Sequence, residues 1–135
     1  MTDCIFCKII NGEIPCAKVY EDSDVIAFLD ISPVNPGHTL VVPKKHYETL
    51  FDLPDDLACK VMKALKKIVS AVKEAVDADG ININQSNLKP AGQLIPHVHF
   101  HIIPRNIGDG LRHWPQKKYE EGQMEEVRKN IDKRL

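Results

Sequence analysis

Three histidines alternate with apolar residues in the segment HVHFHIIPR, residues 97–105. If this segment is a β-strand, the side chains of His97, His99 and His101 share one face, because side chains alternate between the two faces of a strand. Neighbours on that face lie about 6.5–7 Å apart at a rise of ~3.3 Å per residue. That spacing is too wide for one metal ion to bind all three through bonds of ~2.0–2.1 Å. We therefore expect the three histidines to have separate functions.

A row of imidazoles suits phosphate chemistry. Neutral imidazole is a competent nucleophile near pH 7, and imidazolium donates hydrogen bonds to anionic oxygen atoms. One histidine can thus attack phosphorus while its neighbour binds a non-bridging oxygen. A half-exposed strand with polar residues outward would explain a single histidine, but it poorly explains three in strict alternation. The residues alone do not indicate which histidine is the nucleophile.

The chain also has four cysteines, two of which, Cys4 and Cys7, form a CxxC pair near the N-terminus. In an intracellular protein, cysteines are more often thiols or metal ligands than disulfides. A single CxxC is a weak signal, because it fits a redox pair, half of a tetrahedral zinc site or chance. Cys16 and Cys59 have no comparable partners.

Length and composition predict one domain over residues 1–135, with a C-terminal tail over about 112–135. The formal net charge of -1 creates no field that would attract nucleic acid or an anionic membrane. No apolar run approaches the ~20 residues of a membrane span, and the N-terminus does not resemble a signal peptide. We expect a cytoplasmic protein that binds neither nucleic acid nor membrane.

The clearest predicted element is a helix over residues 54–78. Pro54, Asp55 and Asp56 suit its first turn, and Asp79-Gly80 is expected to end it. Its apolar residues recur every three or four positions and form one stripe. These residues are Leu57, Val61, Leu65, Ile68, Val72 and Val76.

Short strands are predicted on both sides of this helix, which favours an α+β fold with an antiparallel sheet. A short N-terminal helix should close at Asn11-Gly12, and a polar helix is expected over 119–134. Proline and glycine in 31–38 and 87–93 predict loops. The predicted strands cover 18–22, 24–30, a run from His38 that ends near Pro43, 80–86 and 95–104.

The run His97-Val98-His99-Phe100-His101-Ile102-Ile103 resembles the signature of the histidine triad (HIT) superfamily of nucleotide hydrolases and transferases, in which histidine alternates with apolar residues. CIFCKIINGEIP, AFLDISPVNPGHTLVVPKKHY, AGQ and HWP are similar, in the same order, to the Hint-type branch, so the resemblance covers roughly residues 4–115. It implies an α+β, HIT-like fold: a five-stranded antiparallel sheet with one long helix and a short N-terminal helix. Two such half-barrels would pair as a homodimer.

The resemblance also implies a reaction. His99 would attack the α-phosphorus of a purine nucleotide conjugate, of the nucleoside phosphoramidate type, and form a nucleotidyl-histidine that water cleaves. The main-chain carbonyl of His97 would orient the ring of His99, while His101 and His38 contact the phosphate or neutralise the site. Cleavage of dinucleoside polyphosphates and a nucleotide-binding scaffold with little activity are the alternatives.

Further residues match the nucleotide pocket of HIT relatives. Asp30 would accept hydrogen bonds from both ribose hydroxyls, Gln93 would belong to the same site, and Trp114 would shape the pocket of the partner subunit. The chain departs from many relatives at Leu94, where a Ser or Thr helps the leaving group, and at Ser86, where an Asn contacts phosphate. The expected walls of the base pocket are Phe6, Ile9, Ile14, Phe28 and Ile31.

The resemblance also suggests a role for the CxxC pair. In several bacterial and archaeal HIT proteins two histidines complete a tetrahedral zinc site with such a pair. The matching residues are Cys4, Cys7, His46 and His97. We therefore expect a structural zinc that ties the N-terminal helix to the triad strand, which gives His97 its separate function.

Overall fold

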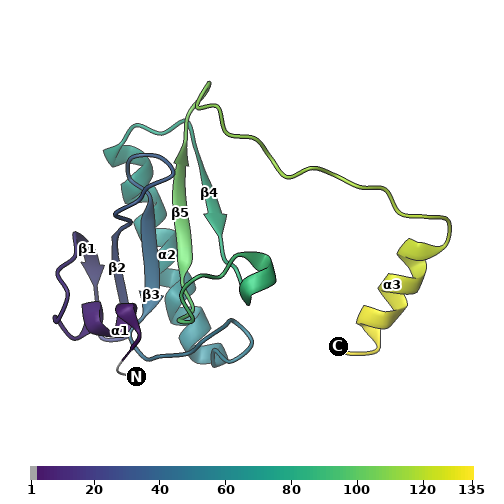
Figure 1. Cartoon of the computed structure of the whole chain (residues 1–135), viewed down its shortest axis with the longest axis horizontal. Coiled ribbons are helices and arrows are strands. Elements are labelled where there is room, and N and C mark those ends of the chain that lie inside the picture. Colours follow the sequence, from purple (N-terminus) through teal and green to yellow (C-terminus); the bar gives the residue numbers. More distant parts are fainter. Residues whose placement is uncertain (1–2) are drawn as a thin grey trace.

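A five-stranded antiparallel sheet forms the centre of the molecule, as predicted (Figure 1). The computed structural model describes residues 3–135. The strand order is β1-β2-β3-β5-β4, so β5, which carries His101 and directly follows the other two histidines of the triad, lies inside the sheet rather than at an edge. The strands are β1 (Lys18–Glu21), β2 (Val25–Leu29), β3 (Thr39–Pro43), β4 (Gly80–Asn84) and β5 (Phe100–Arg105).

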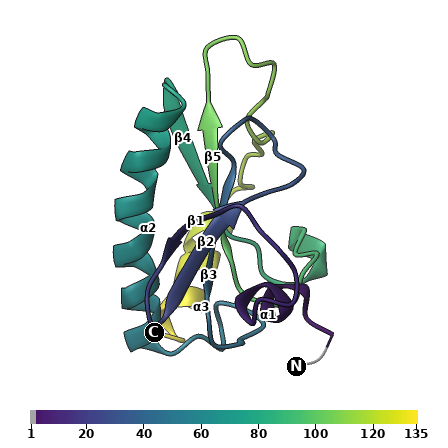
Figure 2. The same cartoon turned by 90° about the vertical axis from the view of Figure 1, so that its left-hand side faces the viewer.

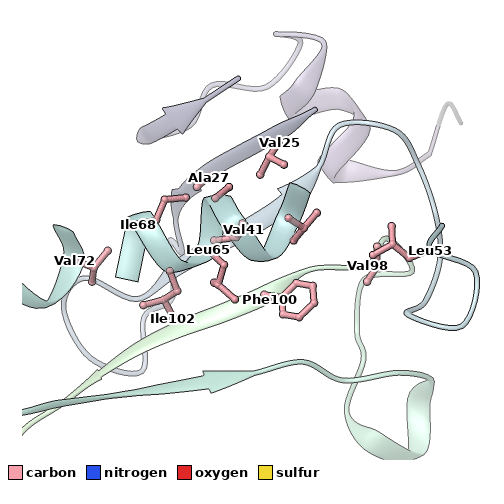
Figure 3. Close-up of a cluster of buried hydrophobic side chains, with 12 residues drawn as sticks. Val25, Ala27, Val41, Leu53, Leu65, Ile68, Val72, Val98, Phe100 and Ile102 are labelled. Atoms are coloured by element: carbon pink, nitrogen blue, oxygen red, sulfur yellow. The ribbon is translucent and has the colours of Figure 1, made fainter. Parts of the chain in front are cut away.

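The long helix α2 (Asp55–Ala75) covers one face of this sheet (Figure 2). Its predicted stripe supplies buried side chains, among them Val61, Leu65 and Ile68, which pack against Val41 and Ile102 of the sheet (Figure 3). Each such side chain contributes about 1.5–3 kcal/mol by leaving water. The helix thus holds the central strands β3 and β5 as a rigid base for the side chains on the opposite face.

The short helix α1 (Ile5–Ile10) lies on that opposite face (Figure 2). Phe6 enters a second core cluster, which includes Ile26 and Phe28 of β2. The helix ends at Asn11, and Gly12 takes a positive φ of 78° that permits the turn. Successive side chains of β2 point to opposite faces of the sheet, so this strand contributes to two cores, one under α2 and one under α1.

The predicted bounds of β5 are wrong at the start, because the strand begins at Phe100 rather than at residue 95. Pro43 ends the neighbouring strand β3 and has no N–H, and its carbonyl accepts a hydrogen bond from the ring of His97 at 2.8 Å. The N–H of Val98 bonds instead to the carbonyl of Tyr47 at 2.7 Å. Residues 97–99 are thus held beside the sheet by other contacts, yet Val98 is fully buried, as the alternation predicts.

Other bounds also differ from the prediction. Helix α2 ends at Ala75, three residues early, because Asp77 turns the chain with a φ of 51°. The strand predicted to residue 86 stops at Asn84, and a 3-10 turn, η1 (Lys89–Ala91), occupies part of the following loop. The terminal helix α3 (Gln123–Asp132) is shorter than its predicted range of 119–134.

Residues 106–122 form an extended arm that contains no helix or strand and leads from β5 to α3. Figure 1 shows α3 away from the rest of the chain, on the side where β4 forms the edge of the sheet. Within residues 3–135, no helix combines the length and the hydropathy needed to cross a membrane.

Candidate active site and metal centre

The ring of His99 is held in one tautomer. Its Nδ1 donates a hydrogen bond to the main-chain carbonyl of His97 at 2.7 Å, which leaves the lone pair on Nε2. Phe6 packs edge-on against the ring, with centroids 5.0 Å apart. Burial lowers the pKa of His99 below its usual value, so the ring is neutral near pH 7. A buried, oriented and neutral imidazole with a free Nε2 is suited to nucleophilic attack.

A second chain of hydrogen bonds orients His101. The N–H of Val34 donates to Nδ1 of His38 at 3.1 Å, so His38 carries its proton on Nε2. That Nε2 donates to Nδ1 of His101 at 2.8 Å. His101 therefore has its own proton on Nε2, and it can donate a hydrogen bond to an anionic group. Burial lowers the pKa of His38, and it lowers the pKa of His101 to about 4.

The loop over 31–38 places His38 within reach of His101 because Gly37 lets the loop pass close to its neighbours. Gly37 has a φ of 93°, and a Cβ there would lie 2.9 Å from a methyl carbon of Val76 and 3.2 Å from the ring of Pro104. The side-chain amide of Asn35 donates to the carbonyl of Pro104 at 2.8 Å. This loop is therefore fastened to the end of β5, and His38 has little freedom to move.

Asp109, four residues after the end of β5, anchors the same region. It accepts from Nε of Arg105 at 2.7 Å and from Asn35 at 3.2 Å. Arg105 also donates to Asn82 of β4 at 2.7 Å. Sequence reasoning missed this network, although the spacing of Arg105 and Asp109 was a visible signal for a turn closed by an ion pair.

A largely apolar cavity of about 290 Å³ opens in front of His99 and His101. Asp30 lies at the same end, with Oδ2 at 3.8 Å from Nε2 of His38, while its Oδ1 accepts from the N–H of Ser32. Ile31 also borders the cavity, but it is 98% exposed and forms part of the rim. The other predicted residues in the lining are Phe6, Ile9, Ile14 and Phe28.

Two residues predicted for this pocket, Gln93 and Ser86, do not line it, and Trp114 was predicted for the pocket of the partner subunit. Gln93 is buried and braces its own loop, donating to the carbonyl of Glu48 at 2.6 Å and accepting from the N–H of Leu88 at 2.7 Å. Ser86 follows β4, outside the lining. Trp114 sits on the arm and is 85% exposed. The lining includes residues without an assigned role in the sequence prediction, namely Ile5, Pro15, Cys16, Leu29, Leu40, Gly92 and Ile95, together with the departure Leu94.

The CxxC pair meets two histidines beside this cavity. The thiol sulfur atoms of Cys4 and Cys7 and the Nδ1 atoms of His46 and His97 lie within 4.8 Å of one another. The four residues come from the start of α1, the segment after β3 and the segment before β5. Their burial and closeness make the cluster able to bind a metal ion.

The separations within the cluster fit a tetrahedral metal site. Ligands bound at ~2.0–2.1 Å through nitrogen and ~2.3 Å through sulfur lie about 3.3–3.8 Å apart. The two Nδ1 atoms are 3.1 Å apart, and the sulfur of Cys7 is 3.4 Å from Nδ1 of His46 and 3.6 Å from that of His97. The sulfur of Cys4 is 3.4 Å from Nδ1 of His97.

Hydrogen bonding also favours a cation in the cluster. Nε2 of His97 donates to the carbonyl of Pro43, so the Nδ1 lone pair of His97 faces the cluster. Nε2 of His46 has no hydrogen-bond partner within the described residues, 3–135, and leaves its Nδ1 for the cluster. The Nδ1 atoms of the two histidines lie 3.1 Å apart, so a cation in the cluster would be bound by both of them.

The HIT domain model matches residues 11–108, which is most of the chain. The chain belongs to the HIT family. An uncharacterized HIT-like protein of Methanocaldococcus jannaschii is 61% identical over 107 residues, which cover 79% of this chain and 82% of that protein. The adenosine 5′-monophosphoramidase of Saccharomyces cerevisiae is 40% identical over 130 residues, covering 95% of this chain and 80% of the yeast protein.

Solved structures of HIT proteins share the fold. The crystal structure of a HIT family member from Bacillus subtilis has a TM-score of 0.91 at 44% identity, with 98% of this chain and 97% of that chain covered. A zinc-bound histidine triad family protein from Mycobacterium smegmatis has a TM-score of 0.78 at 34% identity, with 99% of each chain covered. The family signature and the five-stranded sheet predicted from the sequence are thereby confirmed.

Proposed function

We propose that this HIT protein hydrolyses purine nucleotide conjugates of the nucleoside phosphoramidate type at the α-phosphate. His99 attacks the phosphorus through Nε2, the P–N bond to the leaving group breaks, and the leaving nitrogen takes a proton from solvent and departs as an amine. A nucleotidyl-histidine remains. Water then attacks the same phosphorus and releases the nucleoside monophosphate and the free imidazole. Two displacements at one phosphorus replace one harder direct hydrolysis.

The observation that carries this proposal is the hydrogen bond from Nδ1 of His99 to the carbonyl of His97. It holds the proton on the nitrogen away from the cavity, so the nucleophile needs no general base. The same carbonyl stabilises the cationic ring that exists after attack, because it still accepts the Nδ1 proton. His101 supports the reaction because its Nε2–H donates a hydrogen bond to a non-bridging phosphate oxygen.

The cavity matches the remainder of such a substrate. Its apolar lining offers the aromatic rings of Phe6 and Phe28 and the aliphatic side chain of Ile9 to a base. The carboxylate of Asp30 provides two acceptor oxygens for the two hydroxyls of a ribose. The volume of about 290 Å³ suits a nucleoside and leaves the phosphate at the histidines. The yeast relative with the name adenosine 5′-monophosphoramidase supports the same substrate class.

We propose zinc as the ion of the Cys4, Cys7, His46 and His97 cluster, because two thiolates and two imidazoles are a typical structural zinc set. A bound zinc contributes folding energy here rather than reactivity. The zinc-bound relative from Mycobacterium smegmatis supports this choice. The residues of the cluster would then fasten α1, and with it Phe6, to the segment that carries His99.

We propose that the chain is one HIT domain with a C-terminal tail and works in the cytoplasm as a homodimer. The arm supports the dimer, because Trp114 is 85% exposed and cannot reach the cavity of its own chain as placed. In a dimer the arm brings Trp114 to the cavity of the partner. Cytoplasmic reducing conditions suit the thiolates of the cluster.

Turnover of adenosine phosphoramidate, followed by product analysis, tests this function. We expect release of ammonia and adenosine monophosphate with saturation kinetics. Faster cleavage of dinucleoside polyphosphates in the same substrate panel would favour the alternative hydrolase. Tight binding of adenosine monophosphate without turnover of any conjugate would show a nucleotide-binding scaffold instead.

A further inference from the structure

The carboxylate of Asp109 is the centre of a hydrogen-bonded network that lies outside the cavity, close to the end of β5. Its Oδ2 accepts from Nε of Arg105 at 2.7 Å, from the N–H of Asn106 at 3.1 Å and from Asn35 at 3.2 Å. Its Oδ1 accepts from Nη2 of Arg105 at 3.1 Å and from the N–H of Leu111 at 3.0 Å. Only 9% of this side chain is exposed. A carboxylate has about four lone-pair sites, so these donors use its whole capacity and fix its position.

Asn35 connects this network with the loop that precedes His38. Within residues 31–36, Asn35 is half-buried and the others are exposed. Its side-chain amide donates to Asp109 at 3.2 Å and to the carbonyl of Pro104 at 2.8 Å. Apolar packing therefore does little to hold this part of the loop, and the two hydrogen bonds of Asn35 fasten it to the end of β5.

The segment that Asn35 holds contacts His38 twice. The main-chain carbonyl of Asn35 accepts the N–H of His38 at 3.1 Å, and the N–H of Val34 donates to Nδ1 of the His38 ring, also at 3.1 Å. From the other side, the N–H of Asp30 donates to the carbonyl of His38 at 2.9 Å, which holds the main chain rather than the ring. The direction of the ring thus depends on the segment that Asn35 holds.

The hydrogen bond between His38 and His101 tolerates little movement of this ring. Nε2 of His38 donates to Nδ1 of His101 at 2.8 Å, and a shift of about 1 Å would take this distance out of hydrogen-bond range. Without that donor, Nδ1 of His101 is free to hold the ring proton itself. Nε2 of His101 then has no proton with which to bind a phosphate oxygen.

We propose that Asn35, oriented by Asp109, is a positioning residue for the reaction: it keeps the ring of His38 where that ring holds the proton of His101 on Nε2. The contacts run from Asp109 through Asn35 and His38 to His101. The inference rests on the proposed function, which gives the Nε2–H of His101 its role. The position of the His101 proton is measurable in the free protein, without any substrate.

Steady-state kinetics on adenosine phosphoramidate tests whether Asn35 acts through His38. Asn35→Ala should lower kcat about tenfold, since a misplacement of about 1 Å caused at a distance from the chemistry can cost about 100-fold. KM should stay within about twofold of the wild type. The double variant Asn35→Ala/His38→Met should be no slower than His38→Met, because the same hydrogen bond is already lost. Losses that multiply in the double variant would overturn the proposal, since Asn35 would then act independently of His38.

Two further variants separate this role from a general loosening of the structure. Asp109→Asn keeps the shape of the side chain but weakens the network at its centre, so kcat should fall several-fold, with no further loss in the His38→Met background. Asn106→Ala is the matched control, because Asn106 is exposed and, within residues 3–135, bonds to Asp109 only through main-chain atoms. Its kcat should equal that of the wild type. A loss as large as that in Asn35→Ala would overturn the proposal.

Nitrogen-15 NMR of the imidazole rings at pH 7 reports the proton of His101 directly. In the wild type without substrate we expect this proton on Nε2, and in folded Asn35→Ala a second population with the proton on Nδ1 should appear. His99 should keep its proton on Nδ1 in both proteins, because its acceptor is the carbonyl of His97. An unchanged His101 tautomer in Asn35→Ala would overturn the positioning role. Failure of the wild type to cleave any conjugate would refute the proposed function instead, and the His101 tautomers would still show whether Asn35 positions His38.

Discussion

His97 connects the candidate nucleophile with the candidate metal centre: its main-chain carbonyl accepts the Nδ1 proton of His99 at 2.7 Å, while its own Nδ1 lies 3.4 Å from the sulfur of Cys4. Its third polar contact, from Nε2 to the carbonyl of Pro43, fixes the ring against the end of β3. The cluster thus holds the side chain of His97, and the main chain of His97 holds the ring of His99. Because the two sites share His97, the direction in which His99 points depends on the contacts around the CxxC pair.

The first prediction concerns the nucleophile. His99→Asn should lower kcat by several orders of magnitude, because covalent catalysis disappears with the attacking nitrogen. Affinity for adenosine monophosphate, measured by calorimetry, should stay within a few-fold of the wild type. In the wild type, a trapped nucleotidyl group should map to residue 99 by mass spectrometry. Label on His101 or His38 would contradict the assignment.

The second prediction concerns the metal. Elemental analysis should find about one zinc per chain. Cys4→Ser should lower the Tm by about 10 °C or more, since loss of a structural zinc removes several kcal/mol of folding free energy. Well below the new Tm, activity should fall much less than stability. Cys59→Ser, at an exposed position of α2, is the control and should leave the Tm unchanged. Metal-free protein with the wild-type Tm would defeat the zinc proposal.

Sequence patterns predicted the core of this fold better than the ends of its elements. The alternation after His97 and the stripe of α2 correctly marked Val98 and Ile68 as buried, because burial follows the period of strand and helix. The start of β5 was predicted wrongly, because it depends on a side-chain contact. The ring of His97 donates a hydrogen bond to the carbonyl of Pro43, which is therefore not available to a strand partner. Such a tertiary contact between residues 54 positions apart leaves no periodic signal.

The residues of the candidate site were likewise predicted only in part. The family signature placed His99, His101 and Asp30 at one cavity, which the structure has. The structure instead gives Gln93 a bracing role in its loop, which a short matching motif cannot distinguish from a ligand contact. Cys16 was missed as a lining residue because one cysteine without partners gives no signal for a pocket.

The third prediction tests the orientation of His101. His38→Met removes the donor to Nδ1 of His101, so the ring of His101 can hold its proton on Nδ1 instead. Its Nε2 then has no proton with which to make a hydrogen bond to the phosphate. We expect kcat to fall by about 10–100-fold, the range typical of a residue that orients another histidine, with little change in nucleotide affinity. His38→Gln keeps an N–H near the original position and should recover most of the loss. Equal activity of the two variants would show that the donor is irrelevant.

The fourth prediction concerns pH. Arg105 holds the pKa of Asp109 well below its ordinary value by pairing with its carboxylate, and N–H groups of Asn106 and Leu111 add to this. The folded state thus favours the ionised form, and this stabilisation is complete above the unfolded pKa of ~3.9. It is lost as pH falls toward the lower pKa of the folded state.

Asp109→Asn should therefore lower the Tm at pH 7, and its difference from the wild type should shrink as the pH is lowered from about 5 to 2. Thermal unfolding across this range measures both. The control is Asp77→Asn, at an exposed turn whose positive φ of 51° asparagine also tolerates. A constant difference between wild type and Asp109→Asn at all pH values would mean that the charge of Asp109 is not responsible.

The last prediction tests whether Trp114 serves the partner. Trp114→Ala homodimers should lose about tenfold in kcat/KM, because an aromatic wall of the substrate pocket is removed. Mixed dimers of His99→Asn with Trp114→Ala chains separate the two arrangements. If Trp114 acts across the dimer, the chain with an intact His99 receives Trp114 from its partner, and activity per intact His99 returns to the wild-type level. If Trp114 acts within its own chain, that pocket still lacks the indole, and activity stays at the level of the Trp114→Ala homodimer.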